Sequence, residues 1–227
     1  MFVNCSNVIW STEQCEIYDN DLHSLLFGHQ LSDRTITCWM FLLQKQYPLM
    51  KWQGENILWD FLPANLSRSF EGKNTNFLRR LVPGKDLEVF AKAKLIFVPL
   101  NLGDEWHWHL LAIDYKSKAF HFYDSNIPRG GEVTRPANTQ EMRKIDISRF
   151  VCAVLEAELG HPSADNFNVH FYRDVSQQMP ESISCGMYVC IFLKSLLTGM
   201  PLQFSWEYMM LQRAFIASEM LKQVDDQ

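Results

Sequence analysis

The stretch QMPESISCGMYVCIFLKSLL, residues 178–197, constrains the fold most because its character changes at Cys185. A proline and two serines precede the cysteine, whereas most residues after it are apolar. A helix that is apolar on all sides is buried inside a protein rather than exposed at its surface. The sequence therefore predicts a buried helix that begins at or next to Cys185, with Ser182 or Ser184 as its cap.

Cys185 has two interpretations at this position. The aligned peptide dipoles at the start of a helix favour a negative charge, so a thiol there loses its proton more easily. The thiolate is the nucleophilic form of cysteine. Gly186 places no side chain beside the sulfur, so the backbone of a substrate can approach it. The alternative is a small, buried cap residue without a chemical role, and the local sequence leaves both open.

The other elements follow from apolar periodicity and from turn residues. We expect strands at 8–10, 57–59, 95–101, 106–114, 119–125 and 169–175, and helices or helical turns at 19–27, 31–48, 74–81, 141–159 and 205–224. Residues 49–66 are otherwise expected to be loop, and 126–140 a mobile loop. Helices on both sides of a group of adjacent strands are typical of an α+β fold. We expect one domain over 1–227, with 1–20 as an N-terminal extension.

Composition excludes several classes of protein. The 227 residues, 47% hydrophobic and 21% charged, are ordinary for one globular domain, and a net charge of -5 argues against a nucleic-acid partner. The six cysteines are scattered without a CxxC pair, which argues against a zinc knuckle and favours a reducing compartment. The N-terminus does not resemble a secretory signal, and no apolar run approaches the roughly 20 residues of a membrane span. We expect a cytoplasmic or nuclear protein.

A predicted hairpin places a histidine and an aspartate within reach of each other. In the strand WHWHLLAID, His107 and His109 point to the same face. If opposing residue numbers in the hairpin sum to 231 or 233, Asp124 lies opposite His107 or one step along that face; a sum of 232 puts it on the other face. A carboxylate in this place binds the far imidazole nitrogen and fixes its tautomer.

Other interpretations of these residues remain. When each residue is considered by itself, the better interpretation of His107 is an ordinary half-buried histidine of a strand. The better interpretation of Asp124 is a cap at a strand end or turn. His107, His109 and His121 could also gather on one sheet face as metal ligands. We disfavour the metal site because no fourth ligand has convincing spacing, and we expect no metal.

The motifs together resemble those of the ubiquitin-like-protein-specific cysteine proteases of the SUMO-protease type. Adenovirus maturation proteases and bacterial effector deubiquitinases are distant relatives of that family. The shared order is the strand IFVPLN, then HWHL, YDS, a glutamine pair and CG. The order His107, Asp124, Cys185 matches the family and differs from the cysteine-first order of papain-like enzymes. The spacing of 17 residues between His107 and Asp124 matches as well.

The resemblance extends over about residues 20–200. The helix LSDRTITCWMFLL resembles the family's WLxDxxIxxYxxLL segment. The family core would then be followed by the predicted C-terminal helix at 205–224. The fold implied is a single α+β cysteine-protease domain. Its central mixed or antiparallel sheet is flanked by helices, and the catalytic cysteine stands at the N-terminus of a buried helix.

The resemblance also implies a role for each site residue. Cys185 attacks the carbonyl, His107 takes its proton and later protonates the leaving amine, and Asp124 orients His107. Gln178 donates a hydrogen bond to the oxyanion together with the backbone N–H of Cys185, with Gln177 as a substitute.

Two departures from the family lie next to the nucleophile. The family usually has aspartate directly before the cysteine, whereas this chain has Ser184 and loses a local charge contact. Gln178 stands seven residues before Cys185, where the SUMO proteases usually have six and the adenoviral type resembles the longer spacing.

A third departure concerns the expected substrate-binding residues, which are Trp108, Gln30, Asp33 and Gly186. In relatives, two tryptophans clamp the Gly-Gly tail of the substrate. Trp108, after the catalytic histidine, keeps one wall of that tunnel, whereas Gln30 replaces the tryptophan of the other wall and opens it. Asp33 keeps the acidic residue of the family's LxD motif.

The function expected from the resemblance is a thiol isopeptidase or endopeptidase. It would cleave after the C-terminal Gly-Gly tail of ubiquitin or of a ubiquitin-like modifier such as SUMO or NEDD8, through a Cys-His-Asp triad and an acyl-enzyme. We expect no cofactor, no nucleic acid and no membrane as partners, and a monomer. The location is the cytoplasm or nucleus, or a host cytosol for a secreted effector. The sequence does not name the modifier.

Two alternatives belong to other functional classes. The first is an acetyltransferase of the same clan, which needs acetyl-coenzyme A and a basic pocket for its phosphates. The candidate basic residues do not form a run; they are Arg129, Arg135, Arg143 and Lys144. The second is a binding module for modifiers that has lost turnover, against which the intact His107, Asp124 and Cys185 argue.

Overall fold

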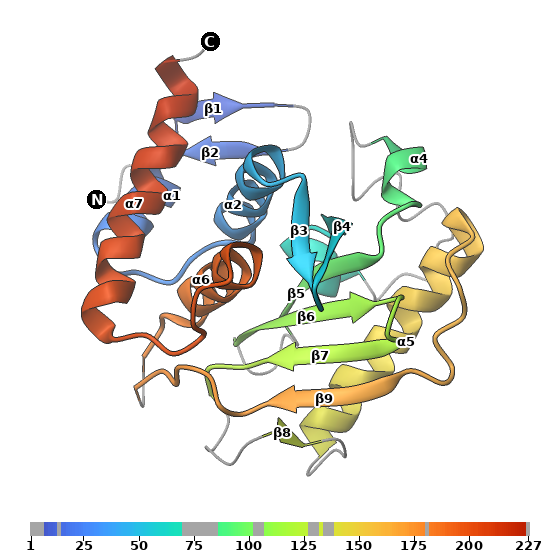
Figure 1. Cartoon of the computed structure of the whole chain (residues 1–227). Coiled ribbons are helices and arrows are strands. Elements are labelled where there is room, and N and C mark those ends of the chain that lie inside the picture. The colour runs from blue at the N-terminus through green and yellow to red at the C-terminus, as the bar shows by residue number, and fades with distance from the viewer. Residues whose placement is uncertain are drawn as a thin grey trace.

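A computed structural model of the chain describes residues 7–12, 15–69, 86–101, 107–126, 132–133, 139–179 and 182–225. A mixed sheet forms the centre of this part of the chain, with strands in the order β3-β4-β5-β6-β7-β9-β8 (Figure 1). Helices cover both faces of the sheet. The predicted α+β fold with a central mixed sheet is therefore confirmed.

The strands of the sheet come from the middle of the chain. Strands β4–β5 and β7–β9 pair in parallel, and all other neighbours pair antiparallel. The strands are β3 (Leu49–Trp52), β4 (Glu55–Phe61), β5 (Leu95–Asn101), β6 (Trp108–Asp114), β7 (Ala119–Tyr123), β8 (Glu132–Val133) and β9 (Asn168–Tyr172). Every residue of β6 and β7 is buried, as expected for strands covered on both faces.

The hairpin of β6 and β7 has the register that brings the predicted site residues together. Leu110 pairs with Tyr123 and Ala112 with His121, so the opposing numbers sum to 233. Continuing this register places Asp124, just after β7, opposite His109, and one step along the same face from His107. The predicted geometry is confirmed.

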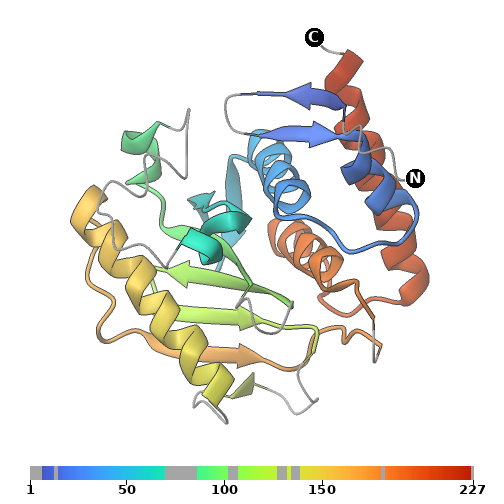
Figure 2. The ribbon, with the colours of Figure 1, turned by 180° about the vertical axis from the view of Figure 1, so that it is seen from behind.

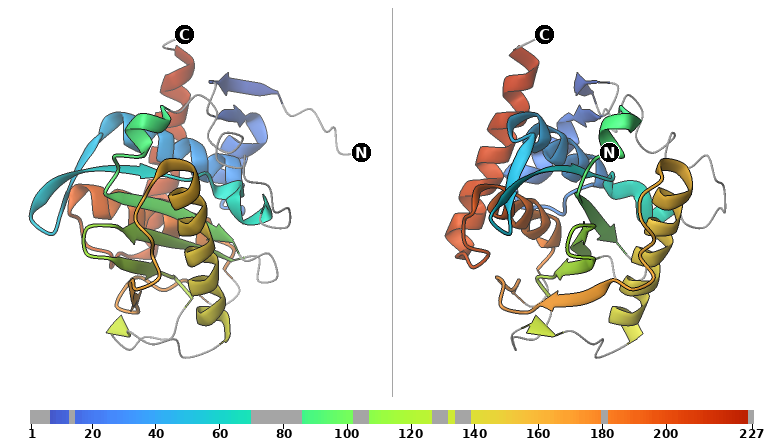
Figure 3. Two further views of the ribbon diagram at one scale, coloured as in Figure 1. Left: turned by 90° about the vertical axis from the view of Figure 1, so that its right-hand side faces the viewer. Right: turned by 45° about the vertical axis from the view of Figure 1, so that its right-hand side comes forward.

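Helices form a layer on each side of the sheet. Helix α5 (Thr139–Leu159) crosses one face, and α6 (Cys185–Thr198) packs on the other face together with α2 (Asp33–Gln46) (Figure 2). Helix α7 (Trp206–Asp225) lies outside α6 (Figure 3). Two apolar cores result: one lies between the sheet and α5, and the other between the sheet and α6. None of the helices in the described residues is both long enough and apolar enough to cross a membrane.

Smaller elements complete the fold. The hairpin of β1 (Val8–Ser11) and β2 (Glu16–Tyr18) forms a separate two-stranded sheet, followed by α1 (Asp19–Leu26). The turn η1 (Ala64–Ser69) and the short α4 (Leu87–Phe90) both lie between β4 and β5 in sequence. The predicted helix at 74–81 and most of the predicted loop at 126–140 lie outside the described residues.

Strand β3 was not predicted, since the sequence indicated loop around a single short strand there. Gln53 and Gly54 both adopt positive φ, 47° and 86°, which makes a tight turn and folds residues 49–61 into a hairpin. The other predicted elements within the described residues are confirmed, with ends that differ by a few residues.

Helix α6 begins at Cys185, as predicted, and ends at Gly199, whose φ of 70° only glycine adopts without strain. Ser184 occupies the cap position, but the predicted side-chain cap is wrong because its hydroxyl bonds no backbone N–H of the helix. Instead, Arg213 Nη2 of α7 donates to Ser184 Oγ over 3.2 Å. Trp39 of α2 donates from Nε1 to the carbonyl of Cys190, which joins α2 to α6.

Candidate active site

The described site lies where β6 begins, β7 ends and α6 starts. His107, directly before β6, has Nε2 2.8 Å from Oδ1 of Asp124. His107 also forms a side-chain hydrogen bond with Cys185. Since Nε2 is engaged with the carboxylate, Nδ1 is the ring nitrogen left for the thiol. The imidazole therefore bridges sulfur and carboxylate.

All three groups are nearly covered by protein. Cys185 has 3% of its surface exposed, His107 6% and Asp124 2%. In such surroundings charges and hydrogen bonds act more strongly than they do in water.

Asp124 receives four hydrogen-bond donors, two on each oxygen. His107 and the backbone N–H of Asn126 lie 2.8 Å from Oδ1. His109 Nδ1 and Lys144 Nζ lie 2.7 Å from Oδ2. Lys144 comes from α5 on that face of the sheet, and its side chain is 4% exposed. Both lone-pair regions of the carboxylate are therefore satisfied inside the protein.

The pKa values of the two histidines are shifted in opposite directions in these surroundings. Burial by itself lowers the pKa of His107, but the hydrogen bonds to Asp124 and Cys185 outweigh burial and raise it to about 9. Burial lowers the pKa of His109 to about 4, so this ring is neutral at physiological pH. Burial opposes ionisation of Asp124, but its histidine and lysine partners hold the pKa of this carboxyl well below its usual range.

The metal alternative meets two obstacles in this geometry. His107, His109 and Asp124 are close enough together to share an ion. However, the Lys144 ammonium and other donors already fill the carboxylate oxygens. The disfavoured alternative in which His121 joins this group does not fit the structure, because the register of 233 places His121 opposite Ala112, on the other face of the sheet. There His121 contacts Tyr172 over 3.0 Å and Asp114 over 3.7 Å.

The two candidate glutamines differ in what their amides do. The side-chain nitrogen of Gln177 donates to the carbonyls of Asp124 and Val175, over 3.2 and 3.1 Å, so it supports the end of β7. Gln178 is anchored by its backbone N–H to the Ser125 carbonyl, 2.7 Å away, and accepts from the Ser125 hydroxyl. No described residue accepts a hydrogen bond from the Gln178 amide nitrogen.

Gly186 corrects an expectation from the sequence. A β-carbon built at Gly186 would lie 3.1 Å from Leu31 Cβ, 3.3 Å from Ile36 Cδ1 and 3.5 Å from Trp108 Cδ1. The missing side chain thus makes room for α2 and β6 rather than for a substrate. Trp108 packs at this junction and is buried, so its ring does not face an open slot in this conformation.

The other two predicted substrate-binding residues lie at the start of α2. Gln30 is exposed and precedes Leu31, whose side chain packs beside Gly186. Asp33 is the first residue of α2 and half-buried, and its carboxylate accepts from the backbone N–H of Arg34 over 3.0 Å. Gln30 is therefore the sequence neighbour of Leu31, the residue that contacts α6 at Gly186.

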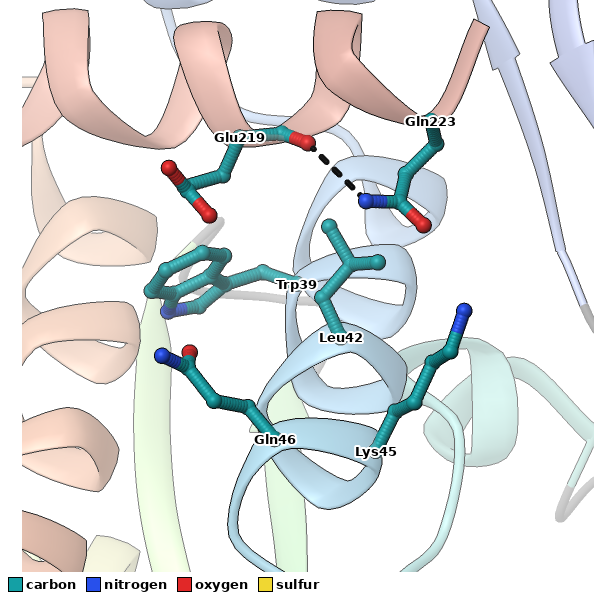
Figure 4. A pocket seen from close by; sticks show the side chains of 6 residues that line it. All are labelled: Trp39, Leu42, Lys45, Gln46, Glu219 and Gln223. Atoms are coloured by element: carbon teal, nitrogen blue, oxygen red, sulfur yellow. Dashed lines mark hydrogen bonds between the residues drawn. The ribbon is translucent and has the colours of Figure 1, made fainter. Parts of the chain in front are cut away.

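A separate hollow of about 300 Å³ lies between α2 and α7 (Figure 4). It is not part of the site described above, since neither Cys185 nor His107 lines it. Its lining combines one aromatic ring and one aliphatic side chain with four polar or charged groups; these residues are Trp39, Leu42, Lys45, Gln46, Glu219 and Gln223.

Comparison with known proteins agrees with the geometry. The sequence profile of the Ulp1 protease family, C-terminal catalytic domain, matches residues 60–225, which include His107, Asp124 and Cys185. The chain belongs to the Ulp1 protease family. Ubiquitin-like-specific protease 1 of Saccharomyces cerevisiae is 28% identical over 210 residues, which cover 92% of this chain and 30% of that relative. This Ulp1-family chain therefore spans about a third of the length of the curated relative.

Solved structures share the fold. The C-terminal Ulp1 protease domain in complex with Smt3, the yeast ortholog of SUMO, has a TM-score of 0.72 at 21% identity and covers 97% of this chain and 90% of its own. The Ulp1-like SUMO protease catalytic domain of Chaetomium thermophilum has a TM-score of 0.61 at 16% identity, with 93% and 83% covered. The Ulp1-type arrangement of sheet and helices is therefore shared at low sequence identity.

Three functional contacts of the Ulp1-family chain were missed from the sequence. His109 was considered only as a metal ligand, although its shared face with His107 was the signal that it reaches Asp124. Lys144 is among the basic residues considered for coenzyme A phosphates, but it is buried against Asp124. Arg213, which reaches Ser184 from α7, carried no signal in its local sequence.

Proposed function

We propose that this protein is a thiol isopeptidase and endopeptidase that cleaves after the C-terminal glycine tail of a ubiquitin-like modifier. One observation carries the proposal: the His107 imidazole bonds both Asp124 and Cys185 in a chain of the Ulp1 family. The yeast relative bound to Smt3 supports SUMO as the first modifier to test, followed by ubiquitin and NEDD8. A reactive free thiol also fits a reducing compartment, cytosol or nucleus.

In the acylation step, the sulfur of Cys185 attacks the carbonyl carbon of the terminal glycine as a thiolate, with its proton held by His107. A tetrahedral oxyanion forms. When the C–N bond breaks, His107 gives its proton to the leaving lysine amine, and a thioester to Cys185 remains. Asp124 keeps the ring oriented and stabilises its protonated form, as the pKa of about 9 for His107 indicates.

In the deacylation step, neutral His107 takes a proton from water while the water oxygen attacks the thioester carbonyl. The C–S bond then breaks, the modifier leaves as a free carboxylate and Cys185 returns as the thiolate. Both steps use one histidine, first as acid and then as base. No cofactor takes part in this scheme.

For the oxyanion, we assign Gln178 rather than Gln177. Gln177 donates its amide to two backbone carbonyls, so it cannot turn toward a substrate without releasing the end of β7. Gln178 has its amide nitrogen available and stands on the segment that leads to α6. The backbone N–H of Cys185 at the helix start is the second donor.

The nearly buried nucleophile supports selectivity for glycine. With 3% of Cys185 exposed and Trp108 packed close to its helix, only a thin, extended chain can bring a carbonyl to the sulfur. Side chains at the last two positions of the tail would collide with the surrounding protein. Exposed Gln30 and half-buried Asp33 then form the outer recognition surface for the modifier.

The test uses SUMO, ubiquitin and NEDD8 that carry C-terminal electrophiles. A covalent adduct that disappears in Cys185→Ala but persists in Cys190→Ala supports the protease. Cys190 is a matched control because it lies in the same helix, and burial raises its pKa to about 12. Binding without an adduct favours a non-catalytic module. Acetyl transfer without an adduct favours the acetyltransferase, which the inward orientation of Lys144 disfavours.

The triad predicts that substitutions of His107 and Asp124 reduce turnover to different extents. His107→Ala removes both the acid and the base and should abolish turnover. Asp124→Asn keeps the shape but loses the charge that orients and stabilises the imidazolium, so we expect weak remaining activity, roughly 10⁴-fold below wild type. Cleavage of a fluorogenic modifier conjugate measures both variants. Equal activity at the wild-type level in both variants and in Cys185→Ala would rule out the triad.

A further inference from the structure

Asp124 is shared by more groups than a simple triad requires. Besides His107, its carboxylate binds His109 Nδ1 and Lys144 Nζ, both 2.7 Å from Oδ2. Both extra partners are buried, with 1% and 4% of their side chains exposed. Lysine is almost never fully buried unless it is paired, because removing an ammonium from water is costly. A contact of this kind at the reacting centre calls for a chemical explanation.

We propose that Lys144 and His109 are positioning residues for the reaction, Lys144 through its charge and His109 through a neutral N–H. This inference rests on the proposed function, because it concerns the same Cys185 chemistry. Both act on Oδ2 of Asp124, which leaves Oδ1 for His107 and the Asn126 backbone. The carboxylate is thereby held in one orientation from both sides.

The charge of Lys144 balances the closed site. With His107 protonated and Cys185 a thiolate, the two charges of that pair cancel, and Asp124 would leave one uncompensated negative charge in buried surroundings. Lys144 supplies the matching positive charge at 2.7 Å. A second cation beside the carboxylate also weakens the hold of Asp124 on the proton of His107, which eases proton release during catalysis.

His109 acts differently because it is neutral. Its ring centre lies 4.6 Å from that of His107, so two protonated rings would repel each other. Since the ionised carboxylate can only accept, Nδ1 of His109 must carry the proton in their contact. The second ring therefore contributes orientation without altering the charge of the site.

The other charged groups near Lys144 either pair with each other or belong to the site. On α5, one turn earlier, buried Glu141 pairs with Arg173 over 2.9 Å, so that pair is internally balanced. The sheet contributes His107, His109 and Asp124, and α6 contributes Cys185. Among these described groups, Lys144 is thus the cation that Asp124 binds besides the imidazole of His107.

The experiment compares the pH profile of Cys185 alkylation by iodoacetamide with the profile of kcat/KM for the modifier conjugate. Lys144→Met and Lys144→Gln should both move the midpoint of the alkylation profile to higher pH, by roughly half to one unit, because protons are held more tightly without the added cation. Lys144→Arg keeps the charge and should keep the midpoint.

The His109 variants provide the matched comparison. His109→Leu should lower kcat/KM by roughly 10- to 100-fold at every pH without moving the midpoint, since geometry alone is lost. His109→Asn should recover most of the rate, because its amide nitrogen can stand in for Nδ1. Thermal unfolding of each variant verifies folding; if Lys144→Met does not fold, the Gln and Arg variants decide.

A midpoint for Lys144→Gln equal to that of wild type overturns the charge role. A midpoint shift in His109→Leu as large as that in Lys144→Gln overturns the division between the two residues. Failure of the proposed function looks different: wild type would label with iodoacetamide but form no adduct with any modifier electrophile. The alkylation profiles would still decide in that case whether Lys144, and not His109, acts through its charge.

Discussion

Ser184, directly before the nucleophile, stands where relatives usually have aspartate. Its hydroxyl accepts a hydrogen bond from Arg213, which also donates to the carbonyls of Ser24 and His29. Arg213 is fully buried, and no ion pair of this guanidinium is found among the described residues. Burial accordingly lowers the pKa of Arg213. A buried cation held by neutral acceptors is a position where a carboxylate should be favourable.

We therefore predict that Ser184→Asp stabilises the protein, by roughly 1–2 kcal/mol, because it gives Arg213 a charged acceptor in place of a hydroxyl. Chemical denaturation of both proteins measures the difference. Ser184→Asn has a similar size without the charge and is the control. A Ser184→Asp protein no more stable than the Asn control would show that the site does not accept the charge.

The two site histidines also predict how stability depends on pH. The unfolded pKa of histidine is about 6.5. The folded pKa of His107 is raised to about 9, so its contribution is complete below pH 6.5 and is lost as pH rises toward 9. The folded pKa of His109 is lowered to about 4, so its contribution is present above pH 6.5 and is lost as pH falls toward 4.

The free energy of unfolding should consequently be largest near pH 6.5 and fall on both sides. Asp124, with a lowered pKa, adds a further loss below about pH 4. Denaturation between pH 4 and 9 gives the curve. His109→Leu should flatten its acid side, and His107→Ala its alkaline side. A free energy that keeps rising from pH 6.5 to 9 would contradict the raised pKa of His107.

At the scale of elements, the start of α6 is positioned by a close contact at Gly186 that a side chain would crowd. A β-carbon at residue 186 would lie 3.1 Å from Leu31 Cβ and 3.3 Å from Ile36 Cδ1, closer than ordinary van der Waals contact. The Cβ of Leu31 is fixed to its own backbone and cannot swing away. Glycine therefore lets α6 approach α2 and β6 this closely without a shift, and the closeness places Cys185 beside His107.

We predict that Gly186→Ala destabilises the protein by about 1 kcal/mol, although alanine favours helices by roughly 0.5–1 kcal/mol. The forced shift of α6 should also slow alkylation of Cys185. Thermal unfolding and alkylation rates measure the two effects. The control is Gly160→Ala, where a β-carbon meets nothing and only a φ of 71° is strained. That control should lose stability but keep the reactivity of Cys185.

At the scale of the whole molecule, one arginine joins three distant segments. Arg213 on α7 reaches Ser24 in α1, His29 before α2 and Ser184 before α6, over 3.1 to 3.2 Å. The outer helix of the fold therefore supports the segment that carries the nucleophile. Helix α7 lies outside the sheet layer (Figure 1). Its Arg213 side chain nevertheless reaches Ser184, directly before Cys185.

Arg213→Met should then affect both stability and chemistry. It removes three hydrogen bonds made by a charged group, and we expect a loss of at least about 2 kcal/mol in unfolding free energy and slower alkylation of Cys185. Arg213→Lys should rescue little, because one ammonium cannot reach the three acceptors with the geometry of the guanidinium fork. Reactivity unchanged in a destabilised Arg213→Met protein would limit the arginine to a structural role.

The sequence by itself predicted most of the elements, the shared face of His107 and His109, and the helix that begins at Cys185. Alternation along 106–114 places His107 and His109 together, and the apolar run after Cys185 identifies a buried helix. These properties depend on near neighbours in the chain, since strand period and helix period are local geometry. The sequence left the sum of opposing residue numbers in the hairpin open between 231, 232 and 233. The structure has 233, which places Asp124 on the face of His107 and His109.

Only the tertiary structure decided how the site is balanced. Lys144 meets Asp124 across 20 residues of sequence, and Arg213 meets Ser24 across 189. The close approach of α2 to α6 explains why residue 186 is a glycine. The register of the β6–β7 hairpin places His121 on the opposite face of the sheet. Such contacts depend on how whole layers pack against each other, and no local periodicity encodes the distance between layers. The groups that complete a buried charge therefore become visible only when the helices are docked on the sheet.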